Sequence, residues 1–169
     1  MRRALVAAAA ALALAACHPP GKDGPSAAAR GSAEAQAFLA KNAKKPGVHV
    51  LPDGLQFEVV RSGPTTGLRP QVGDEVKVNY EGKLLNGQVF DSTYERGQPA
   101  AMPLKGLIPA WVEALQLMRP GDEWILYVPP KLGYGDEGAG GGEIPPGAAL
   151  IFRIELIDVL PGPGRVQQG

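Results

Sequence analysis

Residues that could do covalent or metal chemistry are few in this chain of 169 residues. Its one cysteine, Cys17, and its two histidines, His18 and His49, lie outside the pattern of strands and turns. A Ser or Cys nucleophile would therefore lack an activating histidine, and a structural zinc ion would lack ligands. The glycine-rich run 138–142 has neither the lysine nor the following helix of a phosphate-binding loop. Hydrolases and structural zinc proteins are therefore not expected, and no metal or other cofactor is predicted.

The remaining candidates could contribute to a non-covalent site of apolar and aromatic side chains with a few hydrogen-bond donors. On composition alone, three aromatic residues are more typical of plain core: Phe90, Trp111 and Phe152. Asp91 is equally well explained as a turn or cap residue, and Arg96 lies in a polar run that water could solvate. Tyr134, between two glycines, is less typical of core, so both a rigid loop contact and a ligand contact stay open.

Short strands must position these side chains. Over residues 75–84, Val76, Val78 and Tyr80 fall on one face of a period-2 pattern, and Asn86-Gly87 is a strong hairpin signal. Further strands are predicted at 55–60, 88–90, 124–128 and 150–160. The sequence thus predicts a sheet built from hairpins.

One segment changes period. Ile108, Trp111 and Leu115 recur at helical spacing, which predicts a helix over 108–118 that ends at Arg119-Pro120-Gly121. The expected fold class is α+β, with an antiparallel, twisted sheet of five to six strands wrapped around one short helix. The apolar share of 44% suits a real core, and 17 basic against 17 acidic residues argue against nucleic-acid binding.

The first residues read as a targeting segment. A basic start and the apolar run 4–16 are typical of a secretory signal peptide over residues 1–16, because the run is shorter than the roughly 20 residues that span a membrane. Leu14-Ala15-Ala16-Cys17 resembles the bacterial lipobox, which implies that Cys17 becomes the lipid-modified N-terminus. An ordinary signal peptide with an incidental cysteine is the alternative. The expected location is the periplasm, on a membrane through the lipid, and His18 in place of Asp favours the outer membrane over the inner.

The mature chain divides by composition. Residues 17–32, rich in Pro, Gly, Ala and Ser, are predicted to be a lipidated N-terminus and flexible tether. Residues 33–47 are predicted to be a short helical linker, 48–160 the folded domain, and 161–169 a flexible C-terminal tail.

Five segments of the domain form a specific pattern in order and spacing. They are VNYEG at 78–82, VFDS at 89–92, LIPAW at 107–111, LGYG at 132–135 and IPPG at 144–147. Together they resemble the FKBP-type (tacrolimus-binding) peptidyl-prolyl cis/trans isomerase family over roughly residues 47–160. The resemblance implies an FKBP-like fold, a proline-containing polypeptide as substrate and macrolides as inhibitors.

The resemblance also implies roles for individual residues. Trp111 would form the pocket floor, and the walls would come from Tyr80, Phe90, Leu107, Ile108 and Phe152. The catalytic residues would be Asp91, set against the twisting amide, and Tyr134, whose hydroxyl would bind a substrate carbonyl together with the Ile108 N–H. Arg96 and Tyr80 would fix Asp91, and Ile144 would grip the substrate backbone.

Such chemistry needs no nucleophile. Rotation about a prolyl bond loses amide resonance worth about 18–20 kcal/mol and takes tens to hundreds of seconds. The twisted amide is less dipolar than the planar one, so an apolar pocket disfavours the ground state more. This inventory favours an isomerase assisting folding in the bacterial cell envelope. A non-catalytic module for proline segments, or a chaperone-like surface lipoprotein, are the alternatives.

Two departures from the family qualify these expectations. The linker (FLAKNA at 38–43) resembles that of the macrophage infectivity potentiator subgroup, but little chain precedes it to form that subgroup's dimerisation region, so a monomer is predicted. Ala100 and Ala101 follow Pro99 where the family often has an aromatic wall residue. That side of the pocket is expected to be shallow, with weaker macrolide binding.

Overall fold

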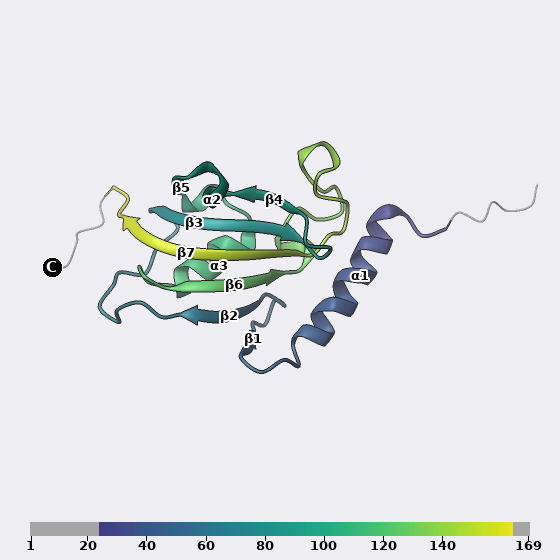
Figure 1. The fold of residues 1–169 in the computed structure, drawn as a ribbon, viewed down its shortest axis with the longest axis horizontal. Helices are drawn as coiled ribbons and strands as arrows, with labels where there is room; N and C mark the ends of the chain where they lie inside the picture. Colours follow the sequence, from purple (N-terminus) through teal and green to yellow (C-terminus); the bar gives the residue numbers. More distant parts are fainter. Residues whose placement is uncertain (1–23, 164–169) are drawn as a thin grey trace, which may run out of the picture.

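The computed structural model describes residues 24–163 and shows one sheet, a helix against its face and a second helix across its end (Figure 1). The strands are β1 Val48–Val50, β2 Gln56–Arg61, β3 Glu75–Leu84, β4 Val89–Ser92, β5 Ala100–Pro103, β6 Glu123–Val128 and β7 Leu150–Leu160. The α-helices are α1 Ala27–Asn42, α2 Thr93–Arg96 and α3 Pro109–Leu117. Short 3₁₀ turns occupy Leu104–Gly106, Pro130–Leu132 and Gly140–Gly142.

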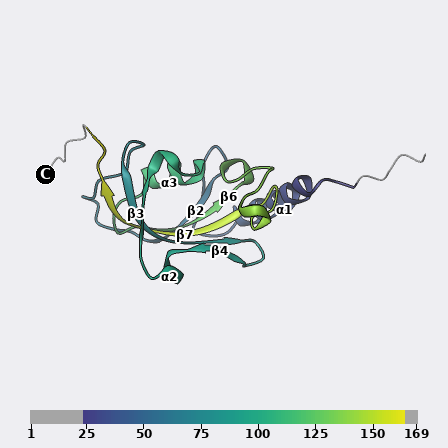
Figure 2. The ribbon, with the colours of Figure 1, turned by 90° about the horizontal axis from the view of Figure 1, so that it is seen from above.

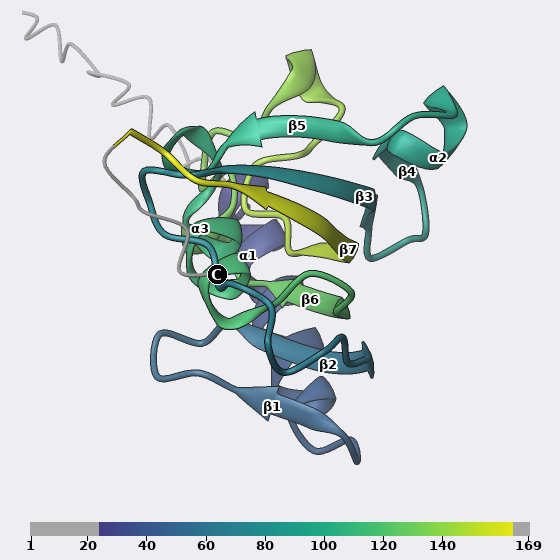
Figure 3. The ribbon, with the colours of Figure 1, turned by 90° about the vertical axis from the view of Figure 1, so that its left-hand side faces the viewer.

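All strand pairs of the described residues are antiparallel, in the order β1-β2-β6-β7-β3-β4. β5 pairs with the first half of β3 (Val76 opposite Met102), and β4 pairs with the second half. The two therefore share one edge of β3, and the chain between them, including α2, bulges away from the sheet (Figure 3).

The core lies between the sheet and α3 (Figure 2). Along β3 every second side chain is buried, as the alternation predicts, and Trp111, Ala114 and Leu115 of α3 face that surface. Pro109 opens the helix at a position where its missing N–H costs nothing. Burying a side chain such as Leu115 contributes about 1.5–3 kcal/mol, so this contact fixes the helix, and with it Trp111, against the sheet.

The predicted α+β class with an antiparallel sheet around one short helix is confirmed. Two strands were not foreseen, β1 and β5, because three residues (VHV) and the segment AAMP are too short or too irregular to show a period. Both exist because a longer neighbour, β2 or β3, offers its edge for pairing. With them, the described residues form a sheet of seven strands instead of five to six.

Helix α1 differs from the predicted linker. It begins at Ala27 and not at Ala33, so residues 27–32, expected in the flexible tether, are helical. Ser26 caps the helix, its hydroxyl accepting the Ala29 N–H at 3.1 Å, which satisfies one of the free amides of the first turn. Gly31 inside the helix costs about 1 kcal/mol relative to alanine. The sequence-based boundary rested on the Pro, Gly, Ala and Ser composition of this stretch, which did not reveal the helix.

The two predicted terminal features fall outside the structure. The signal peptide, Cys17 and the residues up to 23 lie outside the described range, as do residues 164–169 of the predicted tail. Between residues 24 and 163, no helix is both long and apolar enough to cross a membrane.

Candidate functional site

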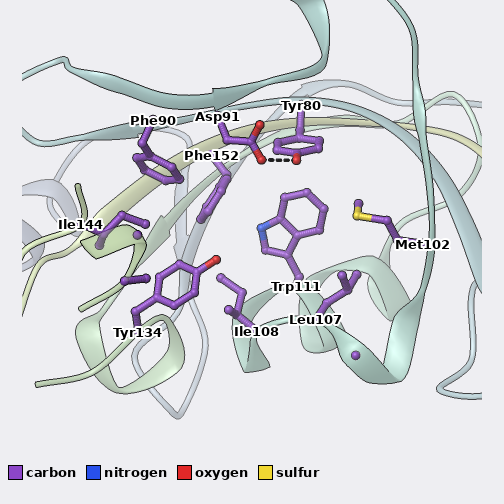
Figure 4. A pocket seen from close by; sticks show the side chains of 13 residues that line it. Tyr80, Phe90, Asp91, Met102, Leu107, Ile108, Trp111, Tyr134, Ile144 and Phe152 are labelled. Carbon is purple, nitrogen blue, oxygen red and sulfur yellow. Dashed lines mark hydrogen bonds between the residues drawn. The ribbon is translucent and has the colours of Figure 1, made fainter. Parts of the chain in front are cut away.

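A cavity of about 400 Å³ opens between α3, the strands β3 and β4, and the loops that flank the sheet. Side chains from many separate segments meet there (Figure 4). The cavity is lined by Tyr80, Phe90, Asp91, Met102, Gly106, Leu107, Ile108, Trp111, Tyr134, Ala139, Gly140, Ile144 and Phe152. Most of this surface is apolar, so the cavity suits a compact hydrophobic group with a few polar atoms around it.

Trp111 forms the floor. It projects from the first turn of α3, is 2% exposed, and meets Tyr80 and Phe152 edge-on with ring centroids 4.9 and 5.3 Å apart. Phe90 in turn meets Phe152 edge-on at 5.6 Å. Such T-shaped contacts fix each ring relative to the next, so the pocket is formed before any ligand arrives.

Gly82 explains why the two phenylalanines can approach so closely. A methyl group in place of its hydrogen would lie 2.7 Å from the rings of both Phe90 and Phe152. The glycine on β3 is therefore a requirement of the pocket wall, although it interrupts an otherwise regular strand.

One corner of the cavity is polar. The Tyr80 hydroxyl donates a hydrogen bond to the Asp91 carboxylate, and the Arg96 guanidinium donates to the other Asp91 oxygen. Arg96 also donates to the Tyr80 hydroxyl, with 3.2 Å between Nη2 and the oxygen. Thr93 supports the corner from behind, its hydroxyl oxygen accepting the Tyr80 backbone N–H at 2.8 Å. The carboxylate is thus held in one orientation by two donors.

These contacts set the charge state of the corner. Burial alone would raise the pKa of Asp91, but the hydrogen bonds from Tyr80 and Arg96 outweigh it and hold that pKa below its usual value. Burial and the bond to Asp91 raise the pKa of Tyr80. At neutral pH, Asp91 is therefore an anion and Tyr80 a neutral donor.

Two further donors face the same cavity. Tyr134 follows the 3₁₀ turn Pro130–Leu132, and its hydroxyl points into the pocket (Figure 4). Burial, with the charge of Asp91, raises the pKa of Tyr134, so its hydroxyl keeps its proton at neutral pH. Ile108 is the N-cap residue of α3: its carbonyl oxygen accepts the Val112 N–H, and its own N–H lies ahead of the helix. Neither group has a hydrogen-bond partner within residues 24–163, so both can bind carbonyl oxygens.

Ile144 closes the rim opposite Trp111. It lies on the long connection between β6 and β7 and is 6% exposed. Ala139 and Ile144 exchange backbone hydrogen bonds at 3.0 and 3.1 Å, which shapes residues 139–144 into a small closed loop at the cavity mouth. The glycine-rich run 138–142 is thus closed at its base by this pair.

The structure brings nine of the ten candidate site residues to one cavity. The tenth, Arg96, does not line it but binds Asp91 and Tyr80 from outside. Sequence reasoning missed Met102, which lines the cavity from β5 beside Leu107. The wall expected to be shallow at Ala100 and Ala101 is therefore partly supplied by Met102. Only the pairing of β5 with β3 turns that side chain inward, and no periodic signal marks it.

The cavity supports binding and electrostatic chemistry. Among the described residues, no group of three or more His, Cys, Asp or Glu side chains could hold a metal ion. A flat, apolar ring on Trp111 would place its neighbouring peptide groups between the Asp91 anion and the donors of Tyr134 and Ile108. The arrangement suits a peptide that presents such a ring.

Two family descriptions match the chain. The one described as FKBP-type peptidyl-prolyl cis-trans isomerase matches residues 67–157, and the one described as the domain amino terminal to such isomerases matches residues 20–59. The second match covers α1, β1 and the first part of β2, and it includes residues 20–47 of the predicted tether and linker.

Individual relatives agree. The chain is 54% identical over 126 residues to the peptidyl-prolyl cis-trans isomerase Mip of Coxiella burnetii, covering 75% of this chain and 54% of the relative. It is 47% identical over 127 residues to the outer membrane protein MIP of Legionella longbeachae, covering 75% and 53%. The chain thus spans about half the length of these curated relatives.

Solved structures show the same fold. FkpA from Escherichia coli superposes with a TM-score of 0.75 at 41% identity, covering 80% of this chain and 62% of that one. A peptidyl-prolyl cis-trans isomerase from Pseudomonas syringae pv. tomato superposes with a TM-score of 0.73 at 37% identity, covering 83% of this chain and 100% of that one.

Proposed function

The chain belongs to the FKBP-type peptidyl-prolyl cis-trans isomerase family, and from that premise we propose that it catalyses rotation about the bond before proline in polypeptides. The observation that carries the proposal is the cavity itself, with its aromatic floor at Trp111 and one ordered carboxylate, Asp91. The cavity of about 400 Å³ accommodates a proline ring and its flanking peptide groups.

Catalysis follows from differences between the planar and the twisted amide. The planar ground state has the larger dipole, because resonance places charge on its oxygen and nitrogen. Transfer to an apolar cavity costs this state more than the twisted transition state, which lowers the barrier. The aromatic walls of Tyr80, Phe90, Trp111 and Phe152 supply that environment.

The polar groups would hold the substrate while the bond rotates. The Ile108 N–H and the Tyr134 hydroxyl bind carbonyls on either side of the proline, so only the prolyl bond turns. Asp91 faces the rotating amide as a fixed anion, because Tyr80 and Arg96 prevent it from turning toward water. Ile144 covers the substrate backbone at the rim.

The test is isomerase activity on a short proline peptide, followed by exchange spectroscopy between the cis and trans forms. Asp91→Leu and Tyr134→Phe should lower kcat/KM, since each removes a group that faces the rotating amide or its carbonyl. Tyr94→Phe is the matched control, because Tyr94 is 44% exposed and does not line the cavity. A folded wild-type protein without activity would assign the cavity to non-catalytic binding of proline segments.

The proposed setting is the bacterial cell envelope, where the protein would assist folding. The residues before Cys17 support secretion, and Cys17 is proposed to carry a lipid that holds the mature protein on the outer membrane. A relative named outer membrane protein MIP is consistent with this placement. Mass spectrometry of the mature N-terminal peptide tests the lipid, and Cys17→Ser should release the protein from the membrane fraction.

The protein is further proposed to be a monomer, as predicted from the sequence. Light scattering of the purified protein measures the mass directly. A dimer mass that persists on dilution would contradict this proposal without affecting the assignment of the pocket.

A further inference from the structure

Helix α1 touches the isomerase domain through backbone alone at one point. A methyl group in place of the Gly31 hydrogen would lie 2.3 Å from the Pro146 carbonyl oxygen and 3.0 Å from the Gly147 carbonyl carbon. Real side chains do not tolerate such approaches, so only glycine fits there. The glycine weakens the helix, yet it permits this contact.

The contact is reciprocal. A methyl group on Gly147 would lie 2.4 Å from the Ala28 carbonyl oxygen and 2.8 Å from the Ser32 amide nitrogen. Gly147 also has a φ of +72°, which other residues rarely adopt. We call this backbone contact between Gly31 of α1 and Pro146-Gly147 the glycine seat. In Figures 1 and 2, α1 accordingly lies beside the connection between β6 and β7.

The glycine seat is close in the structure to two residues that line the cavity, Ile144 and Tyr134. Pro146-Gly147 follows Ile144 almost directly, and the Gly147 N–H donates to the Gly135 carbonyl oxygen at 2.9 Å, next to Tyr134. Residues 134–147 therefore form one closed loop, the rim loop, whose two ends meet at the seat. Both Tyr134 and Ile144, which line the cavity, belong to it.

Apart from α1, the rim loop is held by its own backbone hydrogen bonds and by the burial of Ile144. Six of its residues are glycines with positive φ, and no part of it belongs to a strand of the sheet; the six are Gly135, Gly138, Gly140, Gly141, Gly142 and Gly147. Glycines leave the unfolded loop many conformations, so its order depends on external contacts. Helix α1, anchored by buried Ala35 and by the hydrogen bond from the Asn42 amide to Gln56 at 3.0 Å, supplies one.

We propose that helix α1 positions the rim loop for catalysis, with Gly31 as the positioning residue that acts through Ile144 and Tyr134. The inference rests on the proposed isomerase function. It gives α1 a role inside the catalytic unit, beyond linking the domain to whatever precedes it. A rim loop released from the seat would open the Ala139–Ile144 pair more often and would hold Tyr134 and Ile144 less firmly over the substrate.

The first experiment replaces Gly31 with alanine in the purified protein. Helix propensity alone would make Gly31→Ala stabilise α1, whereas the seat makes the added methyl push α1 from the loop. We expect kcat/KM to fall by between about twofold and thirtyfold, the range for residues that modulate a site without touching the ligand. Ala37→Gln, on an exposed position of the same helix, is the control and should leave kcat/KM unchanged.

Hydrogen exchange provides a readout independent of activity. The amides of Ala139, Ile144 and Gly147 should exchange faster in Gly31→Ala, while the amides of β6 and β7 keep their protection. Faster exchange throughout the sheet would instead mean general destabilisation and would overturn the proposal. Unchanged exchange together with an unchanged kcat/KM would also overturn the proposal.

A double-mutant cycle tests whether the effect passes through the rim. Gly31→Ala combined with Ile144→Ala should cost less than the sum of the two changes, because the residue that the seat positions is already gone. Combined with Met102→Ala, on the opposite wall, the effects should add. Additivity in both cycles would overturn the positioning role. An inactive wild-type protein would refute the isomerase assignment itself, and the exchange result would still decide whether α1 orders the loop.

Discussion

Tyr80→Phe is the most informative single change at the polar corner, because it removes one oxygen and keeps the ring that packs on Trp111. The lost hydroxyl donates to Asp91 and accepts from Arg96. A hydrogen bond to a charged group contributes about 1.5–3 kcal/mol. The Asp91 side chain is 39% exposed, so water screens the bond and the lower value for neutral pairs, about 1 kcal/mol, applies.

The effect should depend on pH with a definite sign. The pKa of Asp91 is lowered in the folded protein, so the stability contributed by its ionised form is present above the unfolded pKa, about 3.9. That contribution is lost as the pH falls through the folded pKa. Without the Tyr80 hydroxyl, the pKa of Asp91 moves up, so Tyr80→Phe costs more at pH 7 than in strong acid.

Urea unfolding at pH 7 and in acid, below the folded pKa of Asp91, measures the difference directly. We expect a loss of about 1 kcal/mol at pH 7, equivalent to a fall in Tm of about 2–4 °C, and a smaller loss in acid. The hydroxyl of Tyr94 has no hydrogen-bond partner among residues 24–163, so Tyr94→Phe should change neither value. Equal losses for Tyr80→Phe at both pH values would refute the argument that the hydroxyl acts on the Asp91 charge.

Three further changes test other parts of the structure. Gly82→Ala should destabilise the protein by about 1–3 kcal/mol in thermal unfolding, because its methyl overlaps the two pocket phenylalanines; an unchanged Tm would contradict the described wall. Met102→Phe should restore an aromatic wall and tighten macrolide binding relative to wild type in calorimetry, and equal affinity would show that this wall does not limit binding. Burial and the hydrogen bond with Asp53 raise the pKa of Glu113 to about 7, so the folded state holds a proton there that the unfolded state releases above its ordinary pKa of about 4.3. The stability that this proton contributes is therefore lost as the pH rises from about 4.3 to 7. Glu113→Gln should be more stable than wild type at pH 8 but not at pH 4. An identical pH profile of stability for the two proteins would show that the Glu113–Asp53 pair does not affect folding.

Local pattern was sufficient for most of the fold. The strict alternation from residue 75 to 84 and the helical spacing from 108 to 118 each report one buried face, and burial of that face is what the fold achieves. The Asn86-Gly87 turn fixed the hairpin because both residues suit the turn geometry and Gly87 has a φ of +89°. β1 and β5 have no periodic apolar face, so the sequence pattern did not predict these two strands.

The site residues could be predicted only in part, because no periodic pattern links the segments that carry them. They come from separate segments, and the family resemblance, not periodicity, nominated Asp91 and Tyr134 for one pocket. The resemblance did not point to Met102. Its inward position follows from the register of β5 with β3, which the sequence AAMP of β5 does not reveal. The role of Gly82 likewise needs the positions of two rings contributed by other strands.

The sequence by itself determined the fold class, the helix that carries Trp111, and the chemical inventory of a pocket without nucleophile or metal ligands, because these depend on residue type and local period. Tertiary structure alone decided that Met102 completes a wall, that Gly82 lies against both Phe90 and Phe152, and that Gly31 meets Gly147. These contacts join residues distant in the chain. They exist only once the sheet order and the packing of both helices are fixed.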